Sequence, residues 1–358
     1  MKILQVVNQM NIGGIETFLM NLYRNIDRKK YQFVFLTYNE SHYDYEDEII
    51  ALGGEVLRIS NPNKVSLPSF MKELHQVIKK EKPDVVHCHT YFNSAYVMMI
   101  SALLKVPIRI CHAHTAFQGK SFASKLKCFV SRKLIRLFAN YKLACSKEAG
   151  YPLYGKGKFT LISNGIDFDQ FYFDQKLREK YRKKFNIKKG DFVIGHVGRL
   201  DIPKNHTFLL QTFQELLKEN PNSTLILIGS GPLEADLKKQ AEELKIKHKI
   251  LFLGNCHNVY ELLNCFDIFV FPSIFEGLPV SLVEAQANGL PILVSDSVSA
   301  EIKLSSTVEF YSLDKGTKAW ADKIKRMDYK RTDTKKEMLK SSYSIETTID
   351  KLAKIYQG

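Results

Sequence analysis

The sequence predicts an α/β protein built from two parallel sheets, each covered by helices on both faces. Short apolar, β-branched runs alternate with longer stretches of helical periodicity, which is the pattern of strands joined by crossover helices. The same alternation starts a second time near residue 193. The length of 358 residues agrees with two domains, because single domains usually span roughly 100–200 residues. We therefore expect two Rossmann-like domains that face each other across a cleft.

Expected strands and helices follow each other in a regular order along the chain. In the first half the strands cover residues 3–7, 33–38, 56–59, 84–87, 108–111, 142–145 and 159–162, and helical stretches such as 15–26, 68–80 and 121–139 separate most of them. In the second half the strands cover residues 193–197, 224–228, 250–253, 268–271 and 292–294. A polar, charged stretch at 167–190 separates the halves. We expect domains at residues 1–168 and 169–342, followed by a helix in 343–358 that could pack back on the first domain.

The composition is typical of a folded, water-exposed protein. Apolar residues make up 45% and charged residues 25% of the chain, and no apolar run approaches the roughly 18 residues that a membrane span needs. The six cysteines form no CxxC pair, which fits a reducing compartment. We therefore expect a cytoplasmic protein.

The net charge of +14 is concentrated in one segment. Residues 119–142 hold seven of the 52 lysines and arginines and no acidic residue, and apolar side chains recur there at helical spacing. This pattern indicates a basic amphipathic helix that lies on an anionic membrane. A helix that packs on the core and exposes a solvated basic face is the alternative. Nucleic acid is not expected as a partner, because no binding motif accompanies the segment.

Two glycines follow the first expected strand. Gly13 and Gly14 open a helix, and adjacent glycines let a backbone approach a ligand while the helix N-terminus favours an anion. A tight turn is the alternative interpretation. No GxGxxG fingerprint occurs here or at residues 229–231, which argues against a nicotinamide or flavin enzyme.

Histidine pairs end two expected strands of the first half. His87 and His89 form one pair, His112 and His114 form the other, and strand alternation places the two members of a pair on one face. Two neighbouring strand ends of this kind could assemble a zinc site, but no carboxylate of matching spacing accompanies them. We expect the histidines to contact a substrate rather than a metal.

Charged residues follow two expected strands of the second half. Arg199 and Lys204 come after strand 193–197, and an arginine fork beside a lysine suits a diphosphate, although solvated surface charges are the simpler alternative. Glu276 and Glu284 come after strand 268–271, around a helix start whose N–H groups would also favour an anion. Carboxylates beside a cationic pair suit the hydroxyls of a sugar.

Together these motifs resemble those of the retaining nucleotide-sugar glycosyltransferases of family 4, which have the GT-B fold. The resemblance spans nearly the whole chain and includes the Gly13–Gly14 loop, the strand end at His114, residues 163–167 and 228–232, and the two charged pairs. The pattern is similar to that of bacterial members that extend capsule or exopolysaccharide repeats on a lipid carrier. It is specific for the family and poorly specific for the sugar.

The resemblance implies a role for each matching residue of this chain. Arg199 and Lys204 would neutralise the donor diphosphate, aided by backbone N–H groups in the segment of Gly277, Leu278, Pro279 and Val280. Glu284 would hold the ribose hydroxyls, and Glu276 would contact the transferred sugar. His114 would bond a hydroxyl of that sugar, with His112 as the alternative, and Gly14 would leave space beside the phosphates. Asn255 would lie near the base.

Enzymes of this family need neither a metal nor another cofactor. The resemblance therefore implies retaining transfer of a hexosyl group from a nucleotide sugar, with UDP as the expected nucleotide, to a glycan or lipid-linked glycan. The enzyme would be cytoplasmic and attached to the inner face of the cell membrane through the basic helix. A nucleotide-sugar epimerase and a non-catalytic scaffold that binds membrane or polymer are the alternatives. The complete set of two cations and two glutamates argues against the scaffold.

Overall fold

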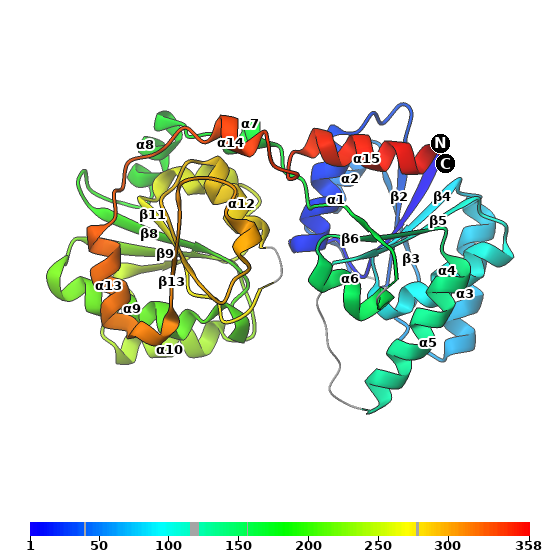
Figure 1. The fold of residues 1–358 in the computed structure, drawn as a ribbon, viewed down its shortest axis with the longest axis horizontal. Helices are drawn as coiled ribbons and strands as arrows, with labels where there is room; N and C mark the ends of the chain where they lie inside the picture. The colour runs from blue at the N-terminus through cyan, green and yellow to red at the C-terminus, as the bar shows by residue number, and fades with distance from the viewer. Residues whose placement is uncertain (39–40, 115–121, 156, 277–278) are drawn as a thin grey trace. The chain divides into compact units, whose positions relative to one another are not determined.

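The computed structural model describes residues 1–38, 41–114, 122–155, 157–276 and 279–358, except for the side chains of 122–126. The chain forms two compact units, unit 1 (Met1–Ile166 with Ser342–Gly358) and unit 2 (Asp167–Ser341). Each unit contains one sheet with helices on both of its faces (Figure 1).

Unit 1 is built on a seven-stranded sheet in which every pairing is parallel. The strand order is β3-β2-β1-β4-β5-β6-β7. The strands are β1 (Lys2–Val6), β2 (Gln32–Thr37), β3 (Glu55–Arg58), β4 (Val85–Cys88), β5 (Ile108–Ala113), β6 (Tyr141–Ala144) and β7 (Thr160–Leu161). All seven strands expected for the first half are therefore present.

Alternating residues of these strands pack into two cores, one on each face of the sheet. Val85 lies in the core that contains Phe18 and Leu352, whereas the next residue, Val86, lies in the core that contains Phe70. Both faces are apolar because helices cover both. The helices are α1 (Gly14–Asn25), α2 (Glu46–Ala51), α3 (Leu67–Glu81), α4 (Ser94–Leu103), α5 (Phe122–Phe138), α6 (Lys147–Tyr154) and α15 (Ile345–Gln357).

Unit 2 repeats this plan with a six-stranded parallel sheet of order β10-β9-β8-β11-β12-β13. The strands are β8 (Phe192–Val197), β9 (Ser223–Ile228), β10 (Ile250–Phe252), β11 (Ile268–Phe271), β12 (Ile292–Ser295) and β13 (Val308–Tyr311). Its helices are α7 (Phe168–Phe171), α8 (Gln175–Lys184), α9 (His206–Glu219), α10 (Glu234–Glu243), α11 (Val259–Leu262), α12 (Val280–Ala287), α13 (Gly316–Arg326) and α14 (Lys335–Met338). The edge strand β13 was not expected.

The charged stretch expected to separate the halves is partly helical. It contains α7 and α8, and both helices belong to unit 2. Arg178 and Arg182 of α8 form ion pairs with Asp267, which precedes β11. Contacts distant in sequence therefore fix a helix whose composition resembles a linker.

The last helix, α15, packs against α1 and belongs to unit 1. Ser344 caps its N-terminus by accepting from the Thr347 amide. Leu352 and Tyr356 are fully buried. Among the described parts of the chain, no helix is long and apolar enough to cross a membrane.

Candidate functional site

Two adjacent strands of unit 2 carry the predicted charged motifs. β8 ends at Val197 and β11 ends at Phe271, and the two strands pair in parallel. Residues that follow them therefore meet at the same edge of the sheet. The loop after β8 contains a single-turn helix, Ile202–Lys204, and its Pro203 carbonyl accepts from the Ile274 amide at 2.8 Å. The two loops are thus bonded directly to each other.

Lys204 and Glu276 lie side by side. The Lys204 ammonium is 2.7 Å from Glu276 Oε1, and each side chain is only 15% exposed. The ammonium also lies over the Phe271 ring, 4.8 Å from its centroid, which adds a cation–π contact. Because both charges are shielded from water, their attraction is stronger than that of a surface pair. The structure therefore brings these two predicted site residues together.

Arg199 lies in a more open environment. Its side chain is 71% exposed, and its Nε is 3.6 Å from a carboxylate oxygen of Asp201. An exposed pair of this kind contributes only about 0–1 kcal/mol. The guanidinium can therefore turn toward a ligand at little cost.

Glu284 projects from α12 into the interior of unit 2. It is 8% exposed, and burial raises its pKa to about 7. The cause is the loss of hydration, which penalises the charged carboxylate. A buried carboxyl group whose pKa is raised to about 7 is a candidate functional group.

The segment in front of Glu284 is described only in part. Gly277 and Leu278 lie outside the described residues. Pro279 is buried with an extended backbone and is followed by Val280, the first residue of α12. Proline carries no N–H group, so Pro279 cannot supply one of the predicted backbone donors, whereas Val280 retains its own.

The loop after β9 packs closely onto the loop after β8. A Cβ atom on Gly229 would lie 2.2 Å from the Gly198 carbonyl oxygen, and the φ of Gly229 is +130°, so only glycine fits there without strain. The Ser230 hydroxyl donates to Asn255 Oδ1 at 2.9 Å, and Asn255 lies in the loop after β10. The predicted residue Asn255 thus belongs to the same connected edge as Lys204.

Three buried polar side chains near Lys204 were missed by the sequence analysis. The rings of His196 and His206 lie 4.6 Å apart, and Ser273 follows β11 directly. Burial lowers the pKa of both histidines, that of His206 to about 4, and the charge of Lys204 adds to the effect. Ser273 Oγ, His196 Nε2 and both ring nitrogens of His206 have no hydrogen-bond partner among the described residues. One sequence feature could have pointed to them: His196 lies near the end of an expected strand, as the histidine pairs of the first half do.

In unit 1, the glycine loop after β1 leads into α1. No described heavy atom lies within 4 Å of the position where Gly14 would carry a Cβ. The close approach falls on Gly13 instead, where a Cβ would lie 2.4 Å from Glu16 Oε2. Glu16 is 8% exposed, and burial raises its pKa to about 7. Glu16 belongs to the predicted motif, but its residue type and position in the motif do not by themselves indicate a role.

Four of the six histidines of unit 1 form one cluster. His112 is fully buried, whereas His114 is partly exposed. His89 Nδ1 lies 2.8 Å from His114 Nε2, and His87 Nε2 lies 3.1 Å from His112 Nδ1. One ring nitrogen from each of His87, His89 and His112 lies within 4.8 Å of the other two, as a metal would require. Among these three rings, His87 and His112 are hydrogen-bonded to each other. The predicted choice of substrate over metal remains a prediction.

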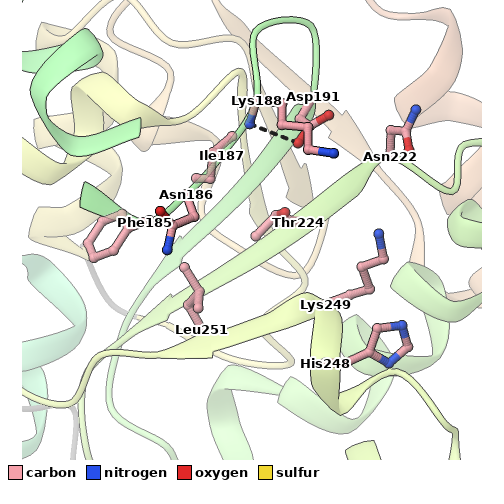
Figure 2. Close-up of a pocket in the computed structure, with 10 residues that line it drawn as sticks. All are labelled: Phe185, Asn186, Ile187, Lys188, Asp191, Asn222, Thr224, His248, Lys249 and Leu251. Carbon is pink, nitrogen blue, oxygen red and sulfur yellow. Dashed lines mark hydrogen bonds between the residues drawn. The ribbon is translucent and has the colours of Figure 1, made fainter. Parts of the chain in front are cut away.

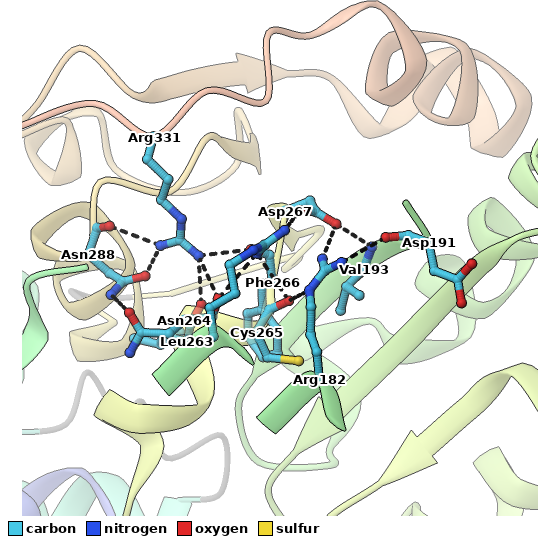
Figure 3. Close-up of polar contacts among 11 residues, drawn as sticks. Arg182, Asp191, Val193, Leu263, Asn264, Cys265, Phe266, Asp267, Asn288 and Arg331 are labelled. Atoms are coloured by element: carbon cyan, nitrogen blue, oxygen red, sulfur yellow. Dashed lines mark hydrogen bonds and ion pairs between the residues drawn. The ribbon is translucent and has the colours of Figure 1, made fainter. Parts of the chain in front are cut away.

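The opposite, amino-terminal edge of the unit 2 sheet contains a well-satisfied polar network (Figure 3). Asp267 accepts from the Val193 amide at 2.7 Å and pairs with Arg178 and Arg182. Arg331 donates to nearby backbone carbonyls, including that of Phe266 at 2.8 Å. These contacts join α8, β8 and the segment before β11.

A small hollow lies at the same amino-terminal edge. It measures about 270 Å³ and is lined by residues in and before β8, β9 and β10, including Asp191, Asn222 and Lys249 (Figure 2). Figure 2 shows the Lys188 amide donating to Asp191 across its rim. Neither this hollow nor the arginine network contains a predicted site residue. The candidate site of unit 2 is therefore the carboxyl-terminal edge.

Comparisons with known proteins bear on the family and the fold. Residues 12–170 match the family model for glycosyltransferase family 4, and residues 177–330 match the model for glycosyl transferases group 1. The Bacillus subtilis (strain 168) protein EpsF, which is named a glycosyltransferase, is 34% identical over 368 residues, covering 99% of this chain and 96% of EpsF. The UDP-Gal:alpha-D-GlcNAc-diphosphoundecaprenol alpha-1,3-galactosyltransferase of Escherichia coli is 31% identical over 253 residues, covering 65% of this chain and 63% of that enzyme.

A solved structure shows the same fold. The crystal structure of Anabaena Alr3699/HepE in complex with UDP and glucose matches with a TM-score of 0.82 at 18% identity, covering 100% of both chains. The predicted fold class, two Rossmann-like parallel-sheet domains as in GT-B glycosyltransferases, is confirmed. Because the match to EpsF spans almost the full length of both proteins and the family models cover both units, this chain belongs to glycosyltransferase family 4.

Proposed function

We propose that this glycosyltransferase catalyses the retaining, metal-independent transfer of a hexosyl group from a UDP-sugar to a lipid-linked glycan in capsule or exopolysaccharide synthesis. The observation that carries the proposal is the shielded Lys204–Glu276 pair at the carboxyl-terminal edge of the sheet, followed along the chain by the buried Glu284 of α12. The UDP in the Anabaena complex and the diphosphoundecaprenol acceptor named for the E. coli relative support the donor and acceptor classes.

The proposed donor site uses the residues of unit 2 according to their charge. Lys204 and Arg199 neutralise the diphosphate, with the amide of Val280 at the start of α12 as a further donor. Glu284 accepts hydrogen bonds from the ribose hydroxyls, and Glu276 contacts the transferred sugar. Asn255 lies near the base. Lys204 therefore exchanges part of its contact with Glu276 for the phosphate oxygens when the donor binds.

The proposed chemistry follows from where charge develops. Breaking the bond between the anomeric carbon and the phosphate oxygen leaves the electron pair on the nucleoside diphosphate. Fixed cations stabilise that charge in the transition state. The anomeric centre becomes oxocarbenium-like, and the Glu276 carboxylate stabilises it. The acceptor hydroxyl attacks from the leaving-group face and gives its proton to the departing diphosphate, so the configuration is retained.

Unit 1 contributes the remaining predicted contacts. His114 bonds a hydroxyl of the transferred sugar, and Gly14 leaves room beside the phosphates, in line with the open space at its Cα. Of the two candidate histidines, His114 is favoured because His112 is fully buried.

We further propose that α5 holds the enzyme on the anionic inner face of the cell membrane. Phe129, Val130 and Leu137 are 54%, 44% and 72% exposed, and Lys133 lies over the Phe129 ring, 4.5 Å from its centroid. These positions share one face of the helix. Exposed aromatic and aliphatic side chains mixed with cations match the interface of an anionic lipid layer.

Calorimetric titration with UDP, GDP and ADP, with and without EDTA, tests the donor site. We expect binding of UDP that EDTA does not change. Lys204→Ala should lower turnover by about 100-fold, the effect of losing one electrostatic donor, whereas Lys238→Ala, which breaks an exposed pair with Glu234 on α10, should leave it unchanged. Wild-type turnover in Lys204→Ala, or EDTA-sensitive binding, would contradict the proposal. Donor turnover without any acceptor product would favour an epimerase, and binding of no nucleotide would favour a scaffold.

A further inference from the structure

Six polar side chains of unit 1, five of them buried, form one continuous hydrogen-bond chain. His112 Nδ1 lies 3.1 Å from His87 Nε2, and His87 Nδ1 lies 2.9 Å from the Tyr356 hydroxyl. The amide nitrogen of Gln5 donates to that hydroxyl at 3.4 Å, and its amide oxygen lies 3.0 Å from His89 Nε2. His89 Nδ1 then lies 2.8 Å from His114 Nε2. The chain joins β1, β4, β5 and α15.

Every imidazole in this chain is neutral at physiological pH. Burial lowers the pKa of all four histidines, that of His114 to about 3. A neutral imidazole carries one proton, so one ring nitrogen donates and the other accepts. The direction of any one bond therefore fixes the direction of the next.

The Gln5 amide sets the direction of one half of the chain. Its NH₂ group donates to the Tyr356 hydroxyl, which leaves the hydroxyl proton of Tyr356 for His87 Nδ1. His87 then carries its own proton on Nε2 and donates it to His112 Nδ1.

The oxygen of the same amide sets the direction of the other half. It accepts from His89 Nε2, so His89 Nδ1 must accept from His114 Nε2. All five bonds point the same way, from His114 toward His112.

We propose that this one-way chain holds His114 as the Nε2–H tautomer, so that its Nδ1 is a hydrogen-bond acceptor reserved for a hydroxyl group. His114 Nδ1 is buried without a partner among the described residues. Asn164 Oδ1 is likewise buried and has no hydrogen-bond partner among the described residues. A sugar hydroxyl can donate to acceptors of this kind.

This inference rests on the proposed function for the identity of the hydroxyl, but not for the tautomer. Gln5, His89 and Tyr356 are then positioning residues, since they act on the substrate only through His114. The opposite tautomer would present N–H at Nδ1 and could only donate. The hydrogen-bond chain therefore decides whether His114 Nδ1 accepts from a hydroxyl group or donates to one.

Nuclear magnetic resonance of the ¹⁵N-histidine-labelled full chain tests the tautomer without any substrate. Long-range ¹H–¹⁵N correlations distinguish a protonated ring nitrogen from an unprotonated one, and the His114 signals are those lost in His114→Asn. We expect a single form in which Nε2 is protonated and Nδ1 is not. A protonated Nδ1, or an equal mixture of the two forms, in the wild-type protein would overturn the proposal.

Two tyrosine variants test the chain itself. Tyr356→Phe keeps the packing of α15 but removes the hydroxyl that orients His87 and Gln5, so His114 should become a mixture of tautomers and kcat should fall about tenfold, the effect of one misdirected hydrogen bond. Tyr31→Phe is the control, because the Tyr31 hydroxyl bonds to Gln357 outside the chain, and it should retain the single tautomer. A single tautomer in both variants would refute the role of Tyr356. Failure of the wild-type protein to bind UDP-glucose would refute the proposed function and leave the tautomer result standing.

Discussion

Replacing Glu284 with glutamine should remove a pH dependence from donor binding. Burial raises the pKa of Glu284 to about 7, so the carboxylate is about one-eleventh ionised at pH 6 and about ten-elevenths ionised at pH 8. If the ribose hydroxyls bond to the carboxylate, the affinity for UDP-glucose should rise about tenfold between these pH values, which is about 1.4 kcal/mol. Glu284→Gln has no carboxylate to ionise, and its affinity should be nearly constant.

The raised pKa of Glu284 also predicts the direction in which the stability of unit 2 changes with pH. Because the folded-state pKa lies above the ordinary value of 4.5, the stabilisation is fully present below pH 4.5 and is lost as the pH rises through 7. Between pH 5 and pH 8 the wild-type protein should lose about 2.5 kcal/mol through this group alone. Glu284→Gln should not show that loss.

Two measurements check both effects. Titration calorimetry with UDP-glucose at pH 6, 7 and 8 gives the affinity, and both phosphates of this ligand are esterified and keep their charge over the range. Urea unfolding followed by fluorescence gives the stability of unit 2, since Trp320 is the only tryptophan of the chain and is fully buried there. Glu243→Gln, an exposed change on α10, is the control. Equal pH profiles for Glu284→Gln and the wild type would refute the reasoning.

Three other outcomes follow from the described contacts. Lowering the pH from 7.5 to 5.5 should destabilise unit 1 more than unit 2. Burial lowers the pKa of four histidines in unit 1 and of two in unit 2, so these rings stay neutral while histidines of the unfolded chain take up protons. One carboxyl group with a raised pKa in each unit, Glu16 or Glu284, offsets part of the loss. Urea unfolding at the two pH values checks this, because Trp320 fluorescence reports unit 2 and far-UV circular dichroism reports both units. If the pH change moves the urea midpoint equally for both signals, the expected difference is wrong. Gly229→Ala should weaken UDP-glucose binding by at least about tenfold, since its Cβ would meet the Gly198 carbonyl. Gly190→Ala is the control, because Gly190 also has a positive φ but has open space around its Cβ position. Calorimetry should show unchanged UDP-glucose affinity for this control. Changing Lys127, Lys133 and Arg136 to glutamate should abolish sedimentation with phosphatidylglycerol vesicles and leave UDP-glucose affinity intact, and surviving vesicle binding would show that α5 is only structural. Arg132 is left out because its guanidinium donates to the Pro152 carbonyl at 2.7 and 2.9 Å.

Strand periodicity predicted most of the fold because the strands are buried on both faces. A strand such as β4 is apolar throughout, since Val85 and Val86 enter different cores. The edge strand β13 escaped prediction because its exposed residue, Glu309, interrupts the apolar run. Helix α8 escaped for a different reason: its stability depends on Arg178 and Arg182 reaching Asp267, and a sequence does not show a contact across more than 80 positions.

The candidate site was predictable to the extent that strand ends are predictable. Lys204 and Glu276 follow neighbouring parallel strands, so their meeting follows from the topology once the family is known. The bond from Gln5 to Tyr356 does not, because it joins residues 351 positions apart. Glu16 lies in the predicted motif, but its raised pKa results from burial that only the structure shows.

The two edges of the unit 2 sheet differ in how well their polar groups are satisfied, and this difference supports the proposed position of the donor site. At the amino-terminal edge, Asp267 has three partners and serves stability. At the carboxyl-terminal edge, Glu284 is buried at the expense of its ionisation, and His206 and Ser273 have unpartnered atoms among the described residues. Buried polar groups without partners destabilise a fold, and such exceptions concentrate at functional sites. A ligand rich in phosphate and hydroxyl groups would satisfy this edge, so donor binding should stabilise unit 2 by more than the new contacts of Lys204 alone.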